Sequence, residues 1–228
     1  MTANKYGKFL TVILVILIVA IIVGLSFLAY NVVKSKEDEK AVREAKAEFD
    51  KNIEKNYEQE DSEQHIQENT NTNSIAPPSG SINSSPNTTR EKTYYKGFVM
   101  LGYINIPKTK VKHLPILDSV SPDALNTSVA VLYPSNPQLN EPGNVVIIGH
   151  NYRNGKFFSN NERLSVGDKV LIKDATGREL SYTIYQKFQT SEQDTSFYTR
   201  DTNGVPEITL STCTDDSKER IIILAKAD

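Results

Sequence analysis

Four patterns of hydrophobic and polar residues follow one another along this chain, and the first is strongly apolar. Residues 9–33 contain no charged side chain, and most positions hold Val, Ile, Leu, Phe or Ala. A helix needs about 20 apolar residues to cross the hydrocarbon core of a membrane, whereas the apolar part of a cleavable signal peptide has only ~7–15. A buried helix of a soluble domain normally keeps a polar face. The pattern therefore predicts a transmembrane helix.

The second segment, residues 34–68, is mostly charged. Its less polar residues recur at every fourth position, namely Ala41, Ala45, Phe49, Ile53 and Tyr57. This spacing is typical of a helix with a narrow apolar stripe. Because two of the five are only Ala, the stripe favours a charged stalk, possibly helical, over a face that binds a partner. We expect this stalk to hold the following domain without packing on it.

The third segment, residues 69–93, consists largely of Asn, Ser, Thr and Pro. Such a composition buries too little apolar surface to offset the entropy that is lost on ordering, so we predict a disordered linker. The chain thus divides into a tail (1–8), a membrane span (9–33), a stalk (34–68), the linker and a globular domain (94–228).

In the globular domain, short apolar runs alternate with turn signals, which is typical of β-strands. Residues 144–150 are apolar enough to be buried on both faces of a sheet, and Ser121 before Pro122 indicates the start of a helical turn. The eight predicted strands are residues 99–106, 111–117, 129–133, 144–150, 169–173, 180–188, 207–213 and 220–226. Eight short strands favour an all-β closed barrel or sandwich, and about 135 residues suffice for one core.

Composition narrows the chemistry that the domain can perform. The net charge of -2 gives no electrostatic case for a nucleic-acid partner. Three histidines and one cysteine are too few for a typical structural zinc site, which takes four ligands, and we expect no metal or other cofactor. A single cysteine excludes an internal disulfide and leaves either an inert buried thiol or a reactive one.

The single cysteine, Cys213, ends one predicted strand, and Arg220 opens the next after six polar residues. If these strands form a hairpin whose midpoint lies between Asp216 and Ser217, the cysteine and the arginine face each other. Opposed residues of an antiparallel pair have Cβ atoms about 4.5–5.5 Å apart. A cation there favours a negatively charged sulfur and can hold an oxyanion. An inert core cysteine beside an ordinary strand-edge arginine is the alternative.

His150 ends the buried strand of residues 144–150 and precedes a polar loop. A position at the end of a buried strand would keep the imidazole partly shielded from water yet accessible to substrate. Imidazole is the usual proton carrier at neutral pH. A purely structural histidine is the alternative. The other two are weaker candidates, because His65 lies in the stalk and His113 lies inside a predicted strand.

Together, three motifs resemble those of the sortases. They are Thr209-Leu210-Ser211-Thr212-Cys213 at a strand end, Arg220 at the start of the next strand, and Gly149-His150-Asn151 after an earlier one. The order along the chain is also that of the family, and residues 101–107 are similar to its first strand. The resemblance covers residues 97–226.

This resemblance implies an eight-stranded sortase-like β-barrel that acts as a cysteine transpeptidase. Cys213 would attack the Thr–Gly bond of a Leu-Pro-x-Thr-Gly-like sorting signal, His150 would transfer protons, and Arg220 would hold the substrate carbonyl and its oxyanion. Thr212 and Asn151 would bind substrate. The implied partners are surface proteins that carry a C-terminal sorting signal and an amine from a peptidoglycan precursor or a pilin.

The resemblance also implies a location and a subclass. Lys and Arg occur on both sides of residues 9–33, so charge alone does not orient the span. The family implies a cytoplasmic tail and a catalytic domain that faces the cell wall of a Gram-positive-type bacterium. Only 62 residues separate His150 from Cys213, which leaves little room for the long helix of class B. The Asp-Pro-aromatic lid motif of class C is missing, so a compact class D-like or class A-like enzyme is expected.

Two other interpretations stay open at this point. An L,D-transpeptidase-like cysteine enzyme would act on peptidoglycan itself, but such enzymes resemble Ser-x-Gly-Cys at the nucleophile, whereas Thr212 precedes Cys213 here. A non-catalytic membrane-tethered β-domain for adhesion or signalling would contain an inert thiol. Thiol reactivity separates this last interpretation from both enzymes.

Overall fold

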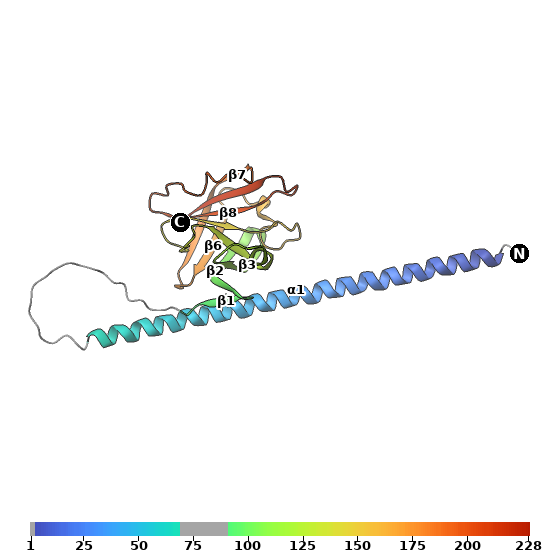
Figure 1. Ribbon diagram of the computed structural model, residues 1–228, viewed down its shortest axis with the longest axis horizontal. Coiled ribbons are helices and arrows are strands. Elements are labelled where there is room, and N and C mark those ends of the chain that lie inside the picture. Colours follow the sequence, from blue (N-terminus) through green and yellow to red (C-terminus); the bar gives the residue numbers. More distant parts are fainter. Residues whose placement is uncertain (1–2, 69–90) are drawn as a thin grey trace, which may run out of the picture. The chain divides into compact units, whose positions relative to one another are not determined.

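The computed structural model describes residues 3–68 and 91–228 of the chain. These residues belong to two compact units that divide the chain after Ala41. The second unit, Val42–Asp228, contains the part of the long first helix that follows this boundary together with all the β-strands (Figure 1).

Helix α1 (Ala3–Glu68) contains both the predicted membrane span and the predicted stalk. The stretch Phe9–Gln59 includes an 18-residue window with a mean hydropathy of 3.3, and none of this window is buried. The helix is thus long and apolar enough near its start to be a candidate membrane span. Residues 34–68 lie wholly within this helix.

The expectation that residues 34–68 do not pack on the following domain is wrong. Ala45, Phe49 and Ile53 are 5%, 2% and 7% exposed, and the Phe49 ring contacts the Tyr103 ring edge to face, with centroids 5.9 Å apart. A small side chain such as Ala45 permits a closer approach of the helix. Alanine in the stripe therefore does not indicate a weak contact surface.

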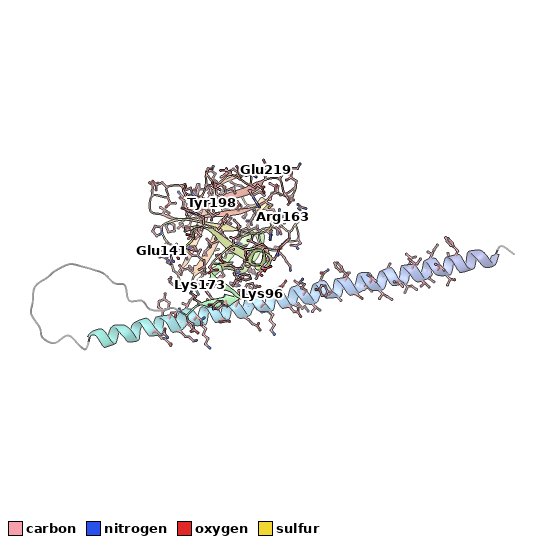
Figure 2. The ribbon with its side chains drawn as sticks, viewed as in Figure 1. Lys96, Glu141, Arg163, Lys173, Tyr198 and Glu219 are labelled. Carbon is pink, nitrogen blue, oxygen red and sulfur yellow. The ribbon has the colours of Figure 1, made fainter. Side chains whose placement is uncertain are left out.

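Polar side chains of α1 add specific contacts on the same face. Asn52 is buried and donates from Nδ2 to Thr93 Oγ1 at 3.0 Å, and Asn56 Oδ1 accepts from the backbone of Glu91 at 3.1 Å. Lys173 of the barrel pairs with Asp50 at 3.1 Å (Figure 2). Burial acts to raise the pKa of Asp50, but hydrogen bonds from Lys46 and Lys173 hold it below its ordinary value.

Strands β2 to β9 form a closed eight-stranded barrel, in the order β2-β3-β4-β5-β8-β9-β7-β6, with β6 pairing back onto β2. The β3–β4 and β5–β8 pairs are parallel and the others are antiparallel. The strands are β2 (Phe98–Ile106), β3 (Val111–Leu117), β4 (Val129–Tyr133), β5 (Gly143–Ile148), β6 (Lys169–Asp174), β7 (Glu179–Thr190), β8 (Pro206–Cys213) and β9 (Arg220–Ala227).

Short helices connect some of these strands. They are η1 (Pro107–Thr109), α2 (Pro122–Thr127) and η2 (Asn161–Arg163). The predicted cap of α2 is confirmed, because the Ser121 hydroxyl accepts a hydrogen bond from the backbone N–H of Ala124 at 3.0 Å. No α-helix lies between β5 and β8 in this fully described part of the chain, as expected from the short spacing.

The eight predicted strands all occur, and each end agrees to within two residues. The sequence did not reveal a further short strand, β1 (Thr93–Tyr95), which pairs with the start of β2. Three residues are too few for a periodic signal, and Thr93 is held by Asn52 of α1 as well as by β2.

Strand β5 is buried on both faces, as predicted. Val145 and Ile147 face the main core inside the barrel, whereas Val146 joins an outer cluster with Phe197, Ile222 and Leu224. The segment between β7 and β8 covers this outer face. Its Arg200 side chain holds it on β8 by donating to Glu207 Oε2 at 2.7 Å and to Thr209 Oγ1 at 2.8 Å.

We predict that Phe49→Ala destabilises the folded domain by about 3 kcal/mol, because it removes a buried aromatic ring and leaves a cavity between α1 and β2. Glu54→Ala, an exposed substitution on the same helix, serves as the control and should change stability by less than about 0.5 kcal/mol. Urea unfolding of a chain that starts at residue 42 measures both. Equal effects of the two substitutions would show that the helix is not part of the cooperative fold.

Candidate active site

The ends of β5 and β8 bring two of the predicted residues to one edge of the barrel. These strands run parallel, with Ile148 paired to Ser211, and the backbone N–H of Gly149 continues the ladder by donating to Ser211 O at 3.2 Å. The same register, extended by two residues, places His150 beside Cys213. The predicted convergence of the base and the nucleophile therefore agrees with the strand pairing.

Gly149 permits this strand end to pass close to the barrel wall. A Cβ atom at this position would lie 2.6 Å from Val129 Cγ1 and 2.9 Å from Phe158 Cδ2. Both distances are too short for any residue with a side chain. Glycine before the histidine is thus required by packing, because Phe158 is fully buried beneath it.

Thr212 joins the two strand ends from inside the fold. It is 2% exposed, and its hydroxyl donates to the carbonyl oxygen of Gly149 at 2.7 Å. The sequence led us to expect a contact between Thr212 and substrate. In this structure the hydroxyl is engaged with the neighbouring strand, and the predicted contact of Thr212 with substrate stays a prediction.

Cys213 and Arg220 are directly opposite each other on β8 and β9, which confirms the predicted hairpin register. The guanidinium donates from Nη1 to the Cys213 sulfur at 2.6 Å, and the thiol is half-buried and free. The connecting turn is tightly closed, since the Thr214 N–H donates to Glu219 O at 2.9 Å. Hydrogen bonds from the Thr214 hydroxyl and the Lys218 backbone lower the pKa of Asp216 in this turn.

Asn151 connects the residue after His150 to the cysteine strand. Its Nδ2 donates to the carbonyl oxygen of Cys213 at 3.1 Å and to Asp215 Oδ1 at 2.8 Å. Its Oδ1 accepts from the backbone N–H of Arg153 at 3.1 Å. The side-chain amide is thus engaged within the protein at both ends, and its predicted contact with substrate stays a prediction.

Arg220 has other neighbours besides the thiol. Its Nη2 lies 3.8 Å from Glu192 Oε2, which belongs to the segment after β7. Burial raises the pKa of Tyr198, while the positive charge of Arg220 acts to lower it.

Glu219, the residue before Arg220, lies on the opposite side of the barrel from Lys173, which contacts α1 (Figure 2).

Sequence reasoning did not identify two acidic residues at this site, Glu192 and Asp215. Asp215 follows Cys213 by two positions within the predicted turn, so the hairpin register could have indicated it. Glu192 had no local signal, because only the pairing of β7 with β9 brings the segment after Thr190 to Arg220. Within the described parts of the chain, no group of three or more His, Cys, Asp or Glu side chains could hold a metal ion.

Comparisons with known proteins found matches in a family model and among solved structures. The family model of the Sortase domain matches residues 104–228, which is more than half of the chain. No curated protein sequence matches the chain.

Among solved structures, sortase D5 of Clostridium perfringens, described as a transpeptidase, is 31% identical with a TM-score of 0.51, and the match covers 57% of this chain and 79% of that one. Sortase C1 of the group B Streptococcus (GBS) pilus island 1 is 24% identical with a TM-score of 0.51, and the match covers 57% of this chain and 64% of that one, slightly less than two thirds of its length.

Sortase A of Listeria monocytogenes is 20% identical with a TM-score of 0.51, and the match covers 57% of this chain and 87% of that one. At this level of identity the likeness concerns the fold alone. The family match, however, extends over most of the barrel. The chain therefore belongs to the sortase family.

Proposed function

We propose that this chain is a membrane-anchored cysteine transpeptidase that cleaves a Leu-Pro-x-Thr-Gly-like sorting signal and transfers the acyl part to an amine. The observation that carries the proposal is the direct contact of the Arg220 guanidinium with the Cys213 sulfur. A free, half-accessible thiol with a cation at hydrogen-bond distance is a typical arrangement for a nucleophile. An inert core thiol does not need such a partner.

In the first half of the reaction, the Cys213 thiolate attacks the carbonyl carbon of the Thr–Gly bond. The carbonyl oxygen becomes an oxyanion, and the Arg220 guanidinium lies where it can donate hydrogen bonds to this charge. His150, as imidazolium, gives a proton to the leaving glycine nitrogen while the C–N bond breaks. The products are a thioester on Cys213 and a free amine.

In the second half, an incoming amine attacks the thioester and loses its proton to His150. The tetrahedral oxyanion forms again beside Arg220 and collapses with release of the Cys213 thiolate. The thioester conserves the acyl energy of the cleaved peptide bond until the amine arrives. Proximity of the three groups is thus needed twice in each turnover.

Thr212 and Asn151 hold the reacting strands together in this proposal. Thr212 bonds the cysteine strand to Gly149, and Asn151 bonds the histidine segment to the cysteine carbonyl. These two bonds lie on either side of His150 in the sequence. Loss of either bond would let the distance between His150 and Cys213 vary. Small misplacements of reacting groups lower the reaction rate considerably.

The biological setting belongs to the same proposal. Helix α1 would anchor the chain through residues 9–33, with the tail of residues 1–8 in the cytoplasm and the barrel facing the cell wall. The acyl donor would be a surface protein with a C-terminal sorting signal, and the amine would come from a peptidoglycan precursor or a pilin. The absence of a long helix between β5 and β8 supports a compact class D-like or class A-like enzyme.

Trapping of the acyl-enzyme tests the proposed nucleophile. We expect a peptide that contains the sorting signal to form a covalent thioester with the wild-type chain, seen by mass spectrometry, and Cys213→Ala to form none. Iodoacetamide should alkylate Cys213 readily, since a reactive thiol is accessible and paired with a cation. A Cys213→Ala chain that still transfers peptide to an amine would contradict the assignment.

The role of Arg220 is tested by Arg220→Lys. Lysine keeps the charge but loses the planar fork that can hold the sulfur and an oxyanion together, so we expect a loss in kcat/KM of roughly 10²–10³. Exposed Arg163 is the matched control, and Arg163→Lys should leave the rate unchanged. Circular dichroism verifies the fold of both variants, and an Arg220→Lys variant with most of the wild-type rate would exclude the oxyanion role.

The hydrogen bond between Thr212 and the Gly149 carbonyl is tested by Thr212→Val, which keeps the shape of the side chain but removes the hydroxyl. The Gly149 carbonyl then loses its buried partner, so we expect stability to fall by about 1–3 kcal/mol. The transpeptidation rate should also fall, because His150 follows that carbonyl directly. Exposed Thr199→Val is the control for the same chemical change. Thermal unfolding and peptide transfer, measured on both variants, decide whether the bond contributes to stability and to the transpeptidation rate.

A further inference from the structure

The ring of His150 lies against a tyrosine that the sequence analysis did not single out. The ring centroids of His150 and Tyr152 are 5.0 Å apart, and the ring planes are tilted by 43°. Asn151, the residue between them, forms a β-bridge with Phe157. Its backbone is therefore extended, and residues on either side of an extended residue project in the same direction. The local backbone thus creates the contact between the two rings.

Tyr152 is itself held in place by three other residues, which belong to two separate parts of the chain. Its hydroxyl donates to Asn126 Oδ1 at 2.9 Å, and its backbone N–H donates to Ser159 Oγ at 3.1 Å. Its ring lies 5.7 Å from the ring of Phe157. The side chain is nevertheless 40% exposed. A tyrosine that is so exposed adds little to the core, so its fixed position calls for another explanation.

Asn126 provides a rigid attachment point. It lies in α2, whose first turn is capped by Ser121 and starts with Pro122, and the neighbouring Ala124 is fully buried. Helix α2 leads directly into β4, and β4 pairs with β5. The acceptor of the Tyr152 hydroxyl is therefore fixed to the barrel independently of the loop that carries Tyr152.

The loop from Asn151 to Phe158 is kept in a conformation that is unfavourable by itself. Phe157 has a φ of 52°, a left-handed conformation that bulky side chains rarely adopt. Such a residue persists only where surrounding contacts determine it. Here the Phe158 N–H donates to the His150 carbonyl at 3.3 Å, and the Asn151–Phe157 bridge closes the loop. These contacts keep Tyr152 over the imidazole.

We propose that Tyr152 is a positioning residue for His150, and that Asn126 of α2 positions Tyr152. The aromatic face of Tyr152 restricts rotation of the imidazole, so that the ring nitrogen stays directed to the place where the leaving and incoming amines are bound. Neither residue touches the reacting atoms. This inference rests on the proposed function of His150 as the proton carrier.

The test compares variants of the full-length chain in detergent micelles. Tyr152→Leu removes the aromatic face, and Tyr152→Phe and Asn126→Ala each remove the hydrogen bond. Asn126→Asp keeps an oxygen acceptor and serves as the conservative rescue. Exposed Tyr94, on β1, gives the matched control Tyr94→Leu. The readouts are kcat and KM for transfer of a sorting-signal peptide to an amine, and the ring-proton NMR signal of His150, assigned by its loss in His150→Gln.

We expect Tyr152→Leu to lower kcat by roughly 10–10²-fold, since a misplaced reacting group can cost up to about that much, and to leave KM close to that of the wild type. The His150 signal should move, because the neighbouring ring no longer shifts it. Tyr152→Phe and Asn126→Ala should have equal, smaller effects that do not add in the double variant. Asn126→Asp should behave like the wild type.

A kcat for Tyr152→Leu that equals that of Tyr94→Leu, or a His150 signal that does not move, would overturn the inference. So would additive effects of Tyr152→Phe and Asn126→Ala. A wild-type chain without transfer activity, or an active His150→Gln variant, would instead overturn the proposed function. The NMR comparison then still decides whether Tyr152 fixes the His150 ring.

Discussion

The parallel pairing of β5 with β8 is the constraint on which the site depends. Parallel strands end at the same edge, so the register that pairs Ile148 with Ser211 also determines where His150 and Cys213 lie. A shift by one residue would turn alternate side chains to the other face and would separate the two groups. The antiparallel partner β9 then adds Arg220 at the level of Cys213. Two registers, each fixed by buried strands, thus set the positions of three residues.

The amino-acid sequence contains the local part of this arrangement. Cys213 and Arg220 are seven residues apart on one hairpin, so their contact follows from the turn between them, and His150 is indicated by the buried strand before it. The bond of Asn151 to the Cys213 carbonyl, the approach of Glu192 to Arg220 and the bond of Tyr152 to Asn126 could not be predicted in this way. Each of them depends on segments that are distant in sequence and come into contact only when the barrel closes. The hydrophobic periodicity of the sequence does not indicate which distant segments will be in contact.

The second part of α1 shows a different limit of sequence reasoning. The sequence pattern indicates its apolar stripe, but the small size of Ala45 wrongly predicts a weak contact surface. In the fold it permits a close approach, and the stripe is supplemented by buried Asn52 and Asn56, whose polar side chains gave no hydrophobic signal. Buried amides are acceptable only with partners, and those partners, Thr93 and Glu91, lie within the last three residues of the predicted linker, which are therefore ordered.

This docked helix has a consequence for the fate of the protein after proteolysis. The covalent chain between α1 and β1 is only one of two attachments of the barrel to the helix, and the other is the noncovalent surface around Phe49, Ile53 and Asn52. A single cut in the intervening chain would therefore produce two pieces that stay associated. After such a cut, release of the barrel would require dissociation of the helix as well as cleavage.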